Sequence, residues 1–181
     1  ILSFCNSIVC CNVWTPFDTM VCGTKDASLM ICSLSRGSVT YDINMKKVLQ
    51  EKFNEIDLDN FVLKKILITP SWGFILTCID AIKKKNGKVV HILPLFNING
   101  NLIRTKEIDF VVSSWSCEKG FDYVLFSDDN GKLFMFEAFY LDVSRPFYRC
   151  QTQIISVKYI VEEMIVIAVS KDGRVFFVPY I

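Results

Sequence analysis

Residues 171–175 read Lys171-Asp172-Gly173-Arg174-Val175, and this short tag is one of four of the same kind along the chain. The other three are Lys25-Asp26-Ala27-Ser28-Leu29, Lys85-Asn86-Gly87-Lys88-Val89 and Asp129-Asn130-Gly131-Lys132-Leu133. When the four tags are aligned on their Asp or Asn, they are separated by 60, 44 and 42 residues. Recurrence at a nearly fixed period indicates an array of similar structural units.

Each tag has the chemistry of a tight turn between two strands. Asn-Gly and Asp-Gly pairs tolerate the positive φ angles of a type I′ turn, so we expect this turn type at the tags. Apolar runs rich in Val, Ile, Phe and Tyr flank several of the tags, as is typical of strands. The sequence therefore predicts four β-hairpins.

Further apolar runs extend each hairpin to a larger unit. First strands are expected at residues 8–14, 62–69, 110–116 and 154–161, and fourth strands at 38–43, 101–108 and 143–150. A four-stranded unit that repeats every ~40–45 residues is typical of a β-propeller blade. We therefore predict an all-β propeller with about four blades, of which three are complete and one is three-stranded.

The predicted blades occupy about residues 1–43, 61–108, 109–150 and 151–181, with an insertion at 44–60. Because the first residue is Ile1 and not Met, we expect the chain to be a fragment of a longer polypeptide and part of a larger propeller. The alternative is a small ring closed on itself, in which residues 1–4 complete the last blade.

The insertion at 44–60 carries apolar residues at roughly helical spacing, with charges between them. These residues are Met45, Val48, Leu49, Phe53 and Ile56. A short amphipathic helix packed on the propeller and a loop are both compatible with this pattern.

Composition limits the classes of function. The chain has 181 residues, 51% of them hydrophobic, and a formal net charge of +1. A nearly neutral chain lacks the basic surface that nucleic acid requires, so no nucleic-acid partner is expected. The most apolar stretches, 61–69 and 154–169, are interrupted by charges and are too short to cross a membrane.

The eight cysteines and single histidine point away from a metal or redox centre. Most of the cysteines lie in apolar runs, no Cys-x-x-Cys occurs, and no ligand cluster with zinc spacing is visible. We expect reduced cysteines in the core of a cytoplasmic protein, with no cofactor. A Cys-His pair would have to use His91, which we interpret as a strand residue and not as a base.

The tags and their flanks resemble the WD40 repeats at the C-terminus of BEACH-domain proteins, the beige and neurobeachin group. The likeness is carried by residues 11–34, by Trp72-Gly73-Phe74-Ile75 leading to residues 96–103, and by residues 154–180 as a terminal repeat. There is no Trp-Asp or Gly-His dipeptide, and the usual Trp position of the repeat holds Cys32, Ile92, Phe136 and Val178. The hydrogen-bonded Asp-His-Ser-Trp network of such repeats therefore cannot form here.

The resemblance implies a WD40-like propeller that serves as a protein-interaction scaffold in membrane or vesicle trafficking, and not an enzyme. It also implies protein partners, including the upstream BEACH and propeller segments of the same polypeptide. No small-molecule substrate is expected. The location it implies is cytoplasmic and peripheral to membranes.

The densest positive cluster is a candidate binding surface. Lys83, Lys84, Lys85 and Lys88 lie in the second tag and could contact acidic partners or anionic lipid headgroups, although a solvated hairpin is the simpler interpretation. Trp72 flanks a turn and is a second candidate contact, while core packing is the simpler interpretation for it, as for Trp14 and Trp115. The acidic pairs at 128–129 and 162–163 are interpreted as solvated turn residues.

Two other hypotheses remain open. A propeller enzyme would need ionisable residues converging from the first strands, but these strands are mainly apolar with isolated lysines. A purely architectural segment would only complete a larger propeller and would bind no partner beyond its own parent chain.

Overall fold

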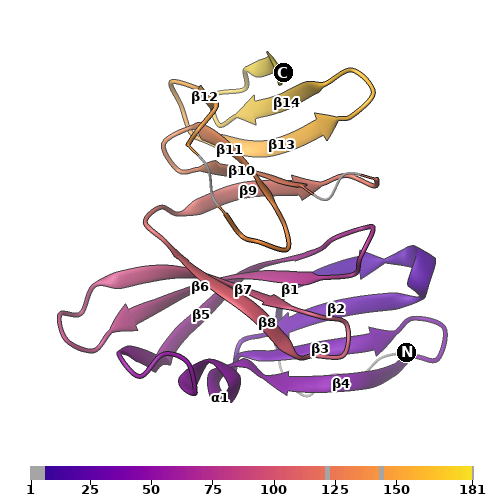
Figure 1. The fold of residues 1–181 in the computed structure, drawn as a ribbon, viewed down its shortest axis with the longest axis vertical. Helices are drawn as coiled ribbons and strands as arrows, with labels where there is room; N and C mark the ends of the chain where they lie inside the picture. Colours follow the sequence, from indigo (N-terminus) through magenta and orange to yellow (C-terminus); the bar gives the residue numbers. More distant parts are fainter. Residues whose placement is uncertain (1–6, 121–122, 143–144, 181) are drawn as a thin grey trace. The chain divides into compact units, whose positions relative to one another are not determined.

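Four antiparallel sheets make up the computed structural model, which describes residues 7–120, 123–142 and 145–180 (Figure 1). Residue contacts divide the chain into two compact units. The first unit holds residues 1–68 and 73–109, and the second holds residues 69–72 and 110–181. We describe each unit by itself and name the sheets blades 1 to 4 in chain order.

Blades 1 and 2 form the first unit. Blade 1 has the strands β1 (Ile8–Trp14), β2 (Thr19–Thr24), β3 (Ser28–Ser33) and β4 (Ser38–Asn44), with the short 3-10 helix η1 (Thr15–Phe17) after β1. Blade 2 has β5 (Ile56–Ile68), β6 (Ile75–Lys83), β7 (Val89–Phe96) and β8 (Leu102–Ile108). In both blades each strand pairs with the next one along the chain. This simple order is the meander that the repeat predicts.

The region 44–60 is part helix and part strand. The helix α1 (Met45–Gln50) begins at Asn44, whose side chain accepts a hydrogen bond from the Lys47 amide. The helix is shorter than the apolar spacing predicts, because the chain already enters β5 at Ile56, which pairs with Lys83. The expected strand at 62–69 thus starts six residues early.

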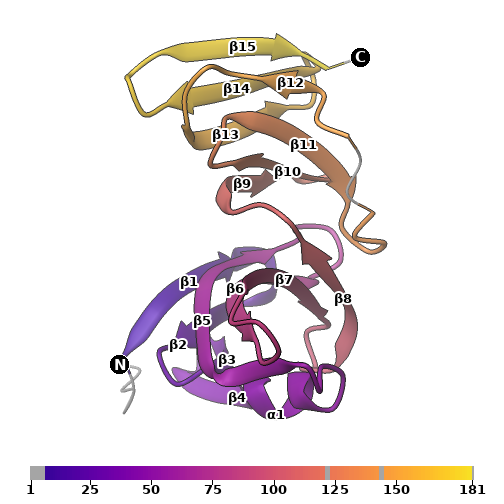
Figure 2. The same cartoon turned by 90° about the vertical axis from the view of Figure 1, so that its left-hand side faces the viewer.

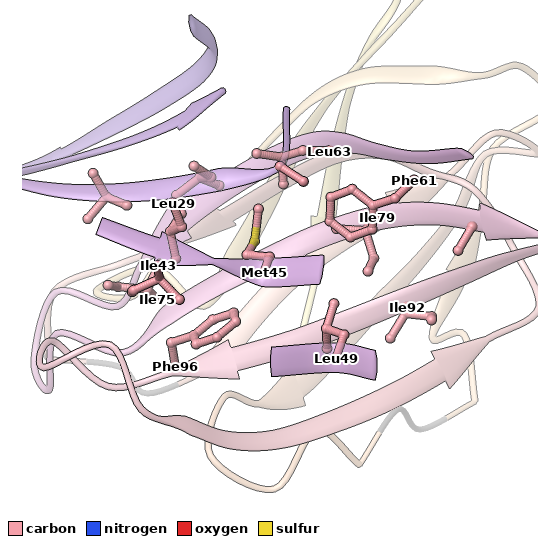
Figure 3. Close-up of a cluster of buried hydrophobic side chains, with 14 of the residues drawn as sticks. Leu29, Ile43, Met45, Leu49, Phe61, Leu63, Ile75, Ile79, Ile92 and Phe96 are labelled. Carbon is pink, nitrogen blue, oxygen red and sulfur yellow. The ribbon is translucent and has the colours of Figure 1, made fainter. Parts of the chain in front are cut away.

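The core of the first unit lies between the two blades and α1. Met45 and Leu49 of α1 are fully buried and pack in one cluster with residues of both sheets, such as Leu29, Ile79 and Phe96 (Figure 3). These three strand residues come from β3, β6 and β7. Burial of large aliphatic side chains stabilises the pair of sheets by about 1.5–3 kcal/mol per side chain.

Blades 3 and 4 form the second unit. Blade 3 has β9 (Val112–Cys117), β10 (Tyr123–Asp128), β11 (Lys132–Glu137) and β12 (Tyr148–Arg149). Blade 4 has β13 (Ile154–Ile160), β14 (Ile165–Ser170) and β15 (Val175–Pro179), so its sheet has three strands in the described residues, with β15 at the edge (Figure 2). The fourth strand expected at 143–150 is reduced to two residues, and Val143 and Ser144 lie outside the described residues. Residues 1–4, the alternative closing strand, also lie outside them.

The tag turns form as hairpins, but the prediction of type I′ geometry is wrong. A type I′ turn needs positive φ at both central residues. In tags one, three and four only the third residue, Ala27, Gly131 or Gly173, has a positive φ, while the preceding Asp or Asn does not. In each of these tags the amide of the third residue donates a hydrogen bond to the carbonyl three residues earlier. This geometry is that of a three-residue hairpin loop whose last residue has the left-handed conformation.

A buried polar side chain closes each of these three turns from within. Thr24, Asp128 and Ser170 occupy the same position in the tag alignment, and all three are buried. The Asp128 carboxylate accepts hydrogen bonds from the amides of Asn130 (3.0 Å) and Lys132 (2.7 Å). The interpretation of Asp128 as a solvated turn residue is therefore wrong, because its carboxylate replaces water with backbone donors.

Candidate functional site

The lysine hairpin is a well-formed extension of blade 2. Its ends are joined by a hydrogen bond from the Lys83 amide to the Lys88 carbonyl (2.9 Å), and its turn by one from the Gly87 amide to the Lys83 carbonyl (2.9 Å). The Lys84 amide donates to the Glu55 carbonyl at 2.9 Å, just before β5. The long β5 therefore supports the hairpin from one side.

The four lysines differ in their surroundings. The Lys83 ammonium forms an ion pair with Glu107 at 2.8 Å, and the Lys84 ammonium donates to the Asn54 carbonyl at 3.2 Å. Lys85 and Lys88 are exposed, and within the described residues their side chains form no ion pair. The charge available to a partner is therefore concentrated on Lys85 and Lys88.

A polar pocket of about 250 Å³, not predicted from the sequence, lies beside Lys84. Lys46 and Lys47 of α1 line it together with Asp57 and Asp59 of β5. Hydrogen bonds from the Asn60 side chain and the Asp59 amide lower the pKa of Asp57, which therefore keeps its negative charge. The pocket is thus mixed in charge, and the only sequence signal for it was that lysines at 46 and 47 are followed by aspartates at 57 and 59.

Trp72 does not belong to the same unit as the lysines. Its side chain is 66% exposed, and the residue groups with the second unit. Core packing, the simpler interpretation, is therefore wrong for Trp72. It holds for Trp14, which is buried against the backbone of Gly73, where an added Cβ would lie 2.2 Å from the indole ring.

His91 is engaged by an aspartate on the neighbouring strand. Its Nδ1 lies 2.6 Å from Asp80 Oδ1, and the other Asp80 oxygen lies 3.3 Å from the Lys64 ammonium. Burial raises the pKa of the nearby Cys78 thiol to about 12, as it does for Cys22. A thiol with such a pKa stays protonated at neutral pH and is not an activated nucleophile.

The described residues contain neither a metal cluster nor a membrane-spanning helix. Among the described side chains, no three His, Cys, Asp or Glu residues are grouped so as to hold a metal ion. In the described part of the chain, no helix has the length and apolar character needed to cross a membrane. None of the seven described cysteines is in a disulfide, and Cys5 lies outside the described residues.

Comparison with solved structures identifies the class of fold. Over 97% of its length the chain matches the β-propeller domain of Cps50 (Swd1) from Myceliophteria thermophila, with a TM-score of 0.67 and 11% identity. It matches the WD40 repeats of RRP9 over 96% of its length, with a TM-score of 0.67 and 12% identity. The four sheets are therefore blades of a WD40-like β-propeller, as the repeats predict.

The matched lengths show how much of a propeller the chain represents. It spans 55% of the Swd1 domain and 48% of the RRP9 repeats, about half of each. It also spans 94% of the computationally designed Ika4 protein, with a TM-score of 0.59 and 12% identity. No family model and no curated protein sequence matches the chain.

Proposed function

We propose that this chain is one part of a larger WD40-type propeller that serves as a protein-interaction scaffold and not as an enzyme. The observation that carries the proposal is the exposed apolar face of blade 4. On β15, Val175 is 51% exposed and Phe177 is 68% exposed. Apolar faces of this kind mark sites of protein contact.

The repeat supports one occupant for this face. In the tag alignment Val175 and Phe177 correspond to Leu29 and Ile31 in blade 1, which are buried in one cluster with blade 2. The corresponding residues of blade 3, Leu133 and Met135, are buried in one cluster with blade 4. By this equivalence, the face that carries Val175 and Phe177 is shaped for a following blade.

We therefore assign this face to a further propeller blade of the same polypeptide. The two natural propellers that the chain matches continue for about as many residues again, which supports this occupant. Ile165, Ile167 and Val169 of β14 extend the face, because they pair with Pro179, Phe177 and Val175. A blade with an apolar side of similar width would bury all of them.

We further propose that the chain belongs to the terminal propeller of a BEACH-type protein that acts in membrane or vesicle trafficking. The support for this assignment is the resemblance of residues 11–34, 72–75, 96–103 and 154–180 to that group. Protein partners, a cytoplasmic location peripheral to membranes, and weak contact of Lys85 and Lys88 with anionic headgroups belong to this same proposal.

Size-exclusion chromatography with light scattering on the purified chain tests the exposed face. We expect the chain to self-associate, and Phe177→Glu to shift it towards monomer. Val39→Glu is the matched control, because Val39 is a similarly exposed apolar strand residue in the other unit. A monomeric wild-type chain that unfolds cooperatively would contradict the proposal of a larger propeller.

A further inference from the structure

A cleft of about 310 Å³ lies at one end of blade 1, where loops of both blades of the first unit meet. Its walls come from the break between β1 and β2, the hairpin between β3 and β4, and the turn between β7 and β8. This volume is at the lower end of the range for ligand pockets, roughly 300–1,000 Å³. It suits a few side chains of a peptide better than a large cofactor.

Asp18 holds the two blade 1 walls together. Its carboxylate accepts hydrogen bonds from the Ser33 hydroxyl (2.7 Å), the Ser35 amide (2.8 Å) and the Ser35 hydroxyl (2.5 Å). Its carbonyl accepts a further bond from the Leu34 amide (2.9 Å). Because both the side chain and the backbone of Asp18 bind the hairpin, this part of the cleft is formed before any ligand arrives.

The blade 2 wall is fixed by its own turn and by close packing on β4. The Asn97 side-chain oxygen accepts hydrogen bonds from the amides of Asn99 (3.0 Å) and Asn101 (2.9 Å). Gly100 has φ +82°, and an added Cβ would lie 2.7 Å from Ile43 Cδ1. The turn therefore sits directly against blade 1, with Asn99 at the cleft.

Aromatic surface and unpaired donors face the same cleft. The Phe17 ring stacks on Trp14 with centroids 3.9 Å apart, yet Phe17 remains 59% exposed, and Tyr41 is exposed as well. Within the described residues, the Arg36 guanidinium and the Asn99 carboxamide make no hydrogen bond or ion pair. The cleft thus combines exposed aromatic rings with a guanidinium and a carboxamide that make no hydrogen bond within the described residues.

We propose that this cleft binds an extended peptide segment in which an acidic side chain neighbours an apolar one. The acidic group pairs with the Arg36 guanidinium, whose fork of donors matches a carboxylate or a phosphate. The apolar neighbour lies on Phe17 and Tyr41, and the Asn99 carboxamide bonds the peptide backbone. The inference rests on the scaffold function proposed above and names its binding site and class of partner.

The distribution of charge favours an acidic peptide over a basic one. Both oxygens of the Asp18 carboxylate are already occupied by serine donors, so Asp18 offers little to an incoming cation. The charge of the Arg36 guanidinium contributes to the lowered pKa of Asp18, but within the described residues the guanidinium donates no hydrogen bond. Its donors therefore remain open to an anionic group, which complements its charge.

Fluorescence anisotropy with short labelled peptides tests this site. The probes share Gly-Ser flanks and differ only in a central pair, which is Phe-Glu, Phe-Lys or Phe-phosphoserine. We expect Phe-Glu to bind the wild-type chain and Phe-Lys to bind at least about tenfold more weakly, as loss of one charge-assisted contact implies. Tighter binding of Phe-phosphoserine than of Phe-Glu identifies phosphate as the natural group.

The decisive variant is Arg36→Glu, which we expect to reverse the preference towards Phe-Lys. A reversal is a gain of binding that a misfolded chain cannot show. Lys85→Glu makes the same change of charge outside the cleft and should leave the order unchanged. Equal binding of all three probes, no binding to the wild-type chain, or an unchanged order in Arg36→Glu overturns the proposal.

The two proposals fail in different ways. Proteins that the wild-type chain captures are purified, and their direct binding to the wild-type chain is compared with their binding to Arg36→Glu. If direct binding persists in the variant, the scaffold function stands and the cleft is not its site. If no purified partner binds the wild-type chain, the scaffold function itself is wrong.

Discussion

The backbone of Gly23 lies so close to Leu63 that a Cβ at Gly23 would be 2.0 Å from Leu63 Cδ2. Gly23 is on β2 of blade 1 and Leu63 is on β5 of blade 2, so this contact sets how closely the two sheets pack. Ile66 Cδ1 would lie 2.9 Å away as well, and both side chains are buried. The position thus requires the smallest residue for steric reasons.

We predict that Gly23→Ala destabilises the chain by about 1–3 kcal/mol, because buried neighbours have little room to move. Urea unfolding monitored by fluorescence measures this change. Adding Leu63→Ala to Gly23→Ala should cost less than the sum of the two single changes, because the smaller side chain removes the clash. Strict additivity would show that the close contact does not exist in solution.

Two equivalent turn glycines should respond differently to the same substitution. Gly131 has φ +80°, and its added Cβ would lie 2.4 Å from the Thr152 carbonyl oxygen, whereas Gly173 has φ +87° and nothing within 4 Å. We predict that Gly173→Ala costs about 1 kcal/mol from backbone strain alone, and that Gly131→Ala costs clearly more. Paired thermal melts test the difference, and equal costs would contradict the packing of the chain over Gly131.

Acid should destabilise the fold through carboxylates that accept hydrogen bonds. Hydrogen bonds from Arg174 and then Ser170 lower the pKa of Asp172, and those from Ser35 and Ser33 lower the pKa of Asp18. A lowered folded pKa gives stability that is complete above the ordinary value of 3.8 and is lost as the pH falls below it. We predict that Asp172→Asn flattens the fall in melting temperature between neutral pH and pH about 3. Glu163→Gln, an exposed carboxylate, serves as the control and should leave that fall unchanged.

Thiol reactivity should follow exposure. Cys11 is exposed on β1, while its cross-strand partner Cys22 is buried and burial raises the pKa of that thiol to about 12. We predict that iodoacetamide at mildly alkaline pH modifies Cys11 first among the described cysteines, and modifies Cys22 and Cys78 only after unfolding. Site-by-site mass spectrometry provides the order, and early labelling of Cys78 would show that blade 2 opens.

Vesicle binding should depend on Lys85 and Lys88, whose side chains form no ion pair within the described residues. We predict that Lys85→Ala with Lys88→Ala weakens binding to phosphatidylserine vesicles by about 2 kcal/mol at low salt, roughly thirtyfold. The effect should shrink as salt is added. Lys25→Ala with Lys171→Ala removes the same charge from other tags and is the matched control. Binding that is equal in both double variants rules out the hairpin as the contact.

The short-range features of this protein were predictable from its sequence. Turn glycines, the alternation of apolar runs and the period of the tags act between neighbouring residues, so they located the four hairpins and the WD40-like fold. One error arose where a segment depends on a distant one, because β5 begins at Ile56 where β6 extends to pair with it. The errors at the turns were local, because Asp128 closes its own turn with its carboxylate and only one turn residue takes a positive φ.

The candidate sites also differ in whether their residues are close together in the sequence. The lysine cluster was visible because its residues are consecutive, but only the structure separates Lys83 and Lys84, which have internal partners, from Lys85 and Lys88. The cleft at Arg36 could not be predicted from the sequence, because Phe17, Arg36 and Asn99 are far apart in the chain. They come together only when the two blades pack. The sequence alone determined the repeat and the positions of its turns, because those follow from local backbone preference. Tertiary packing decided which charges remain free and where a partner can bind, because burial and pairing depend on the neighbours that folding brings together.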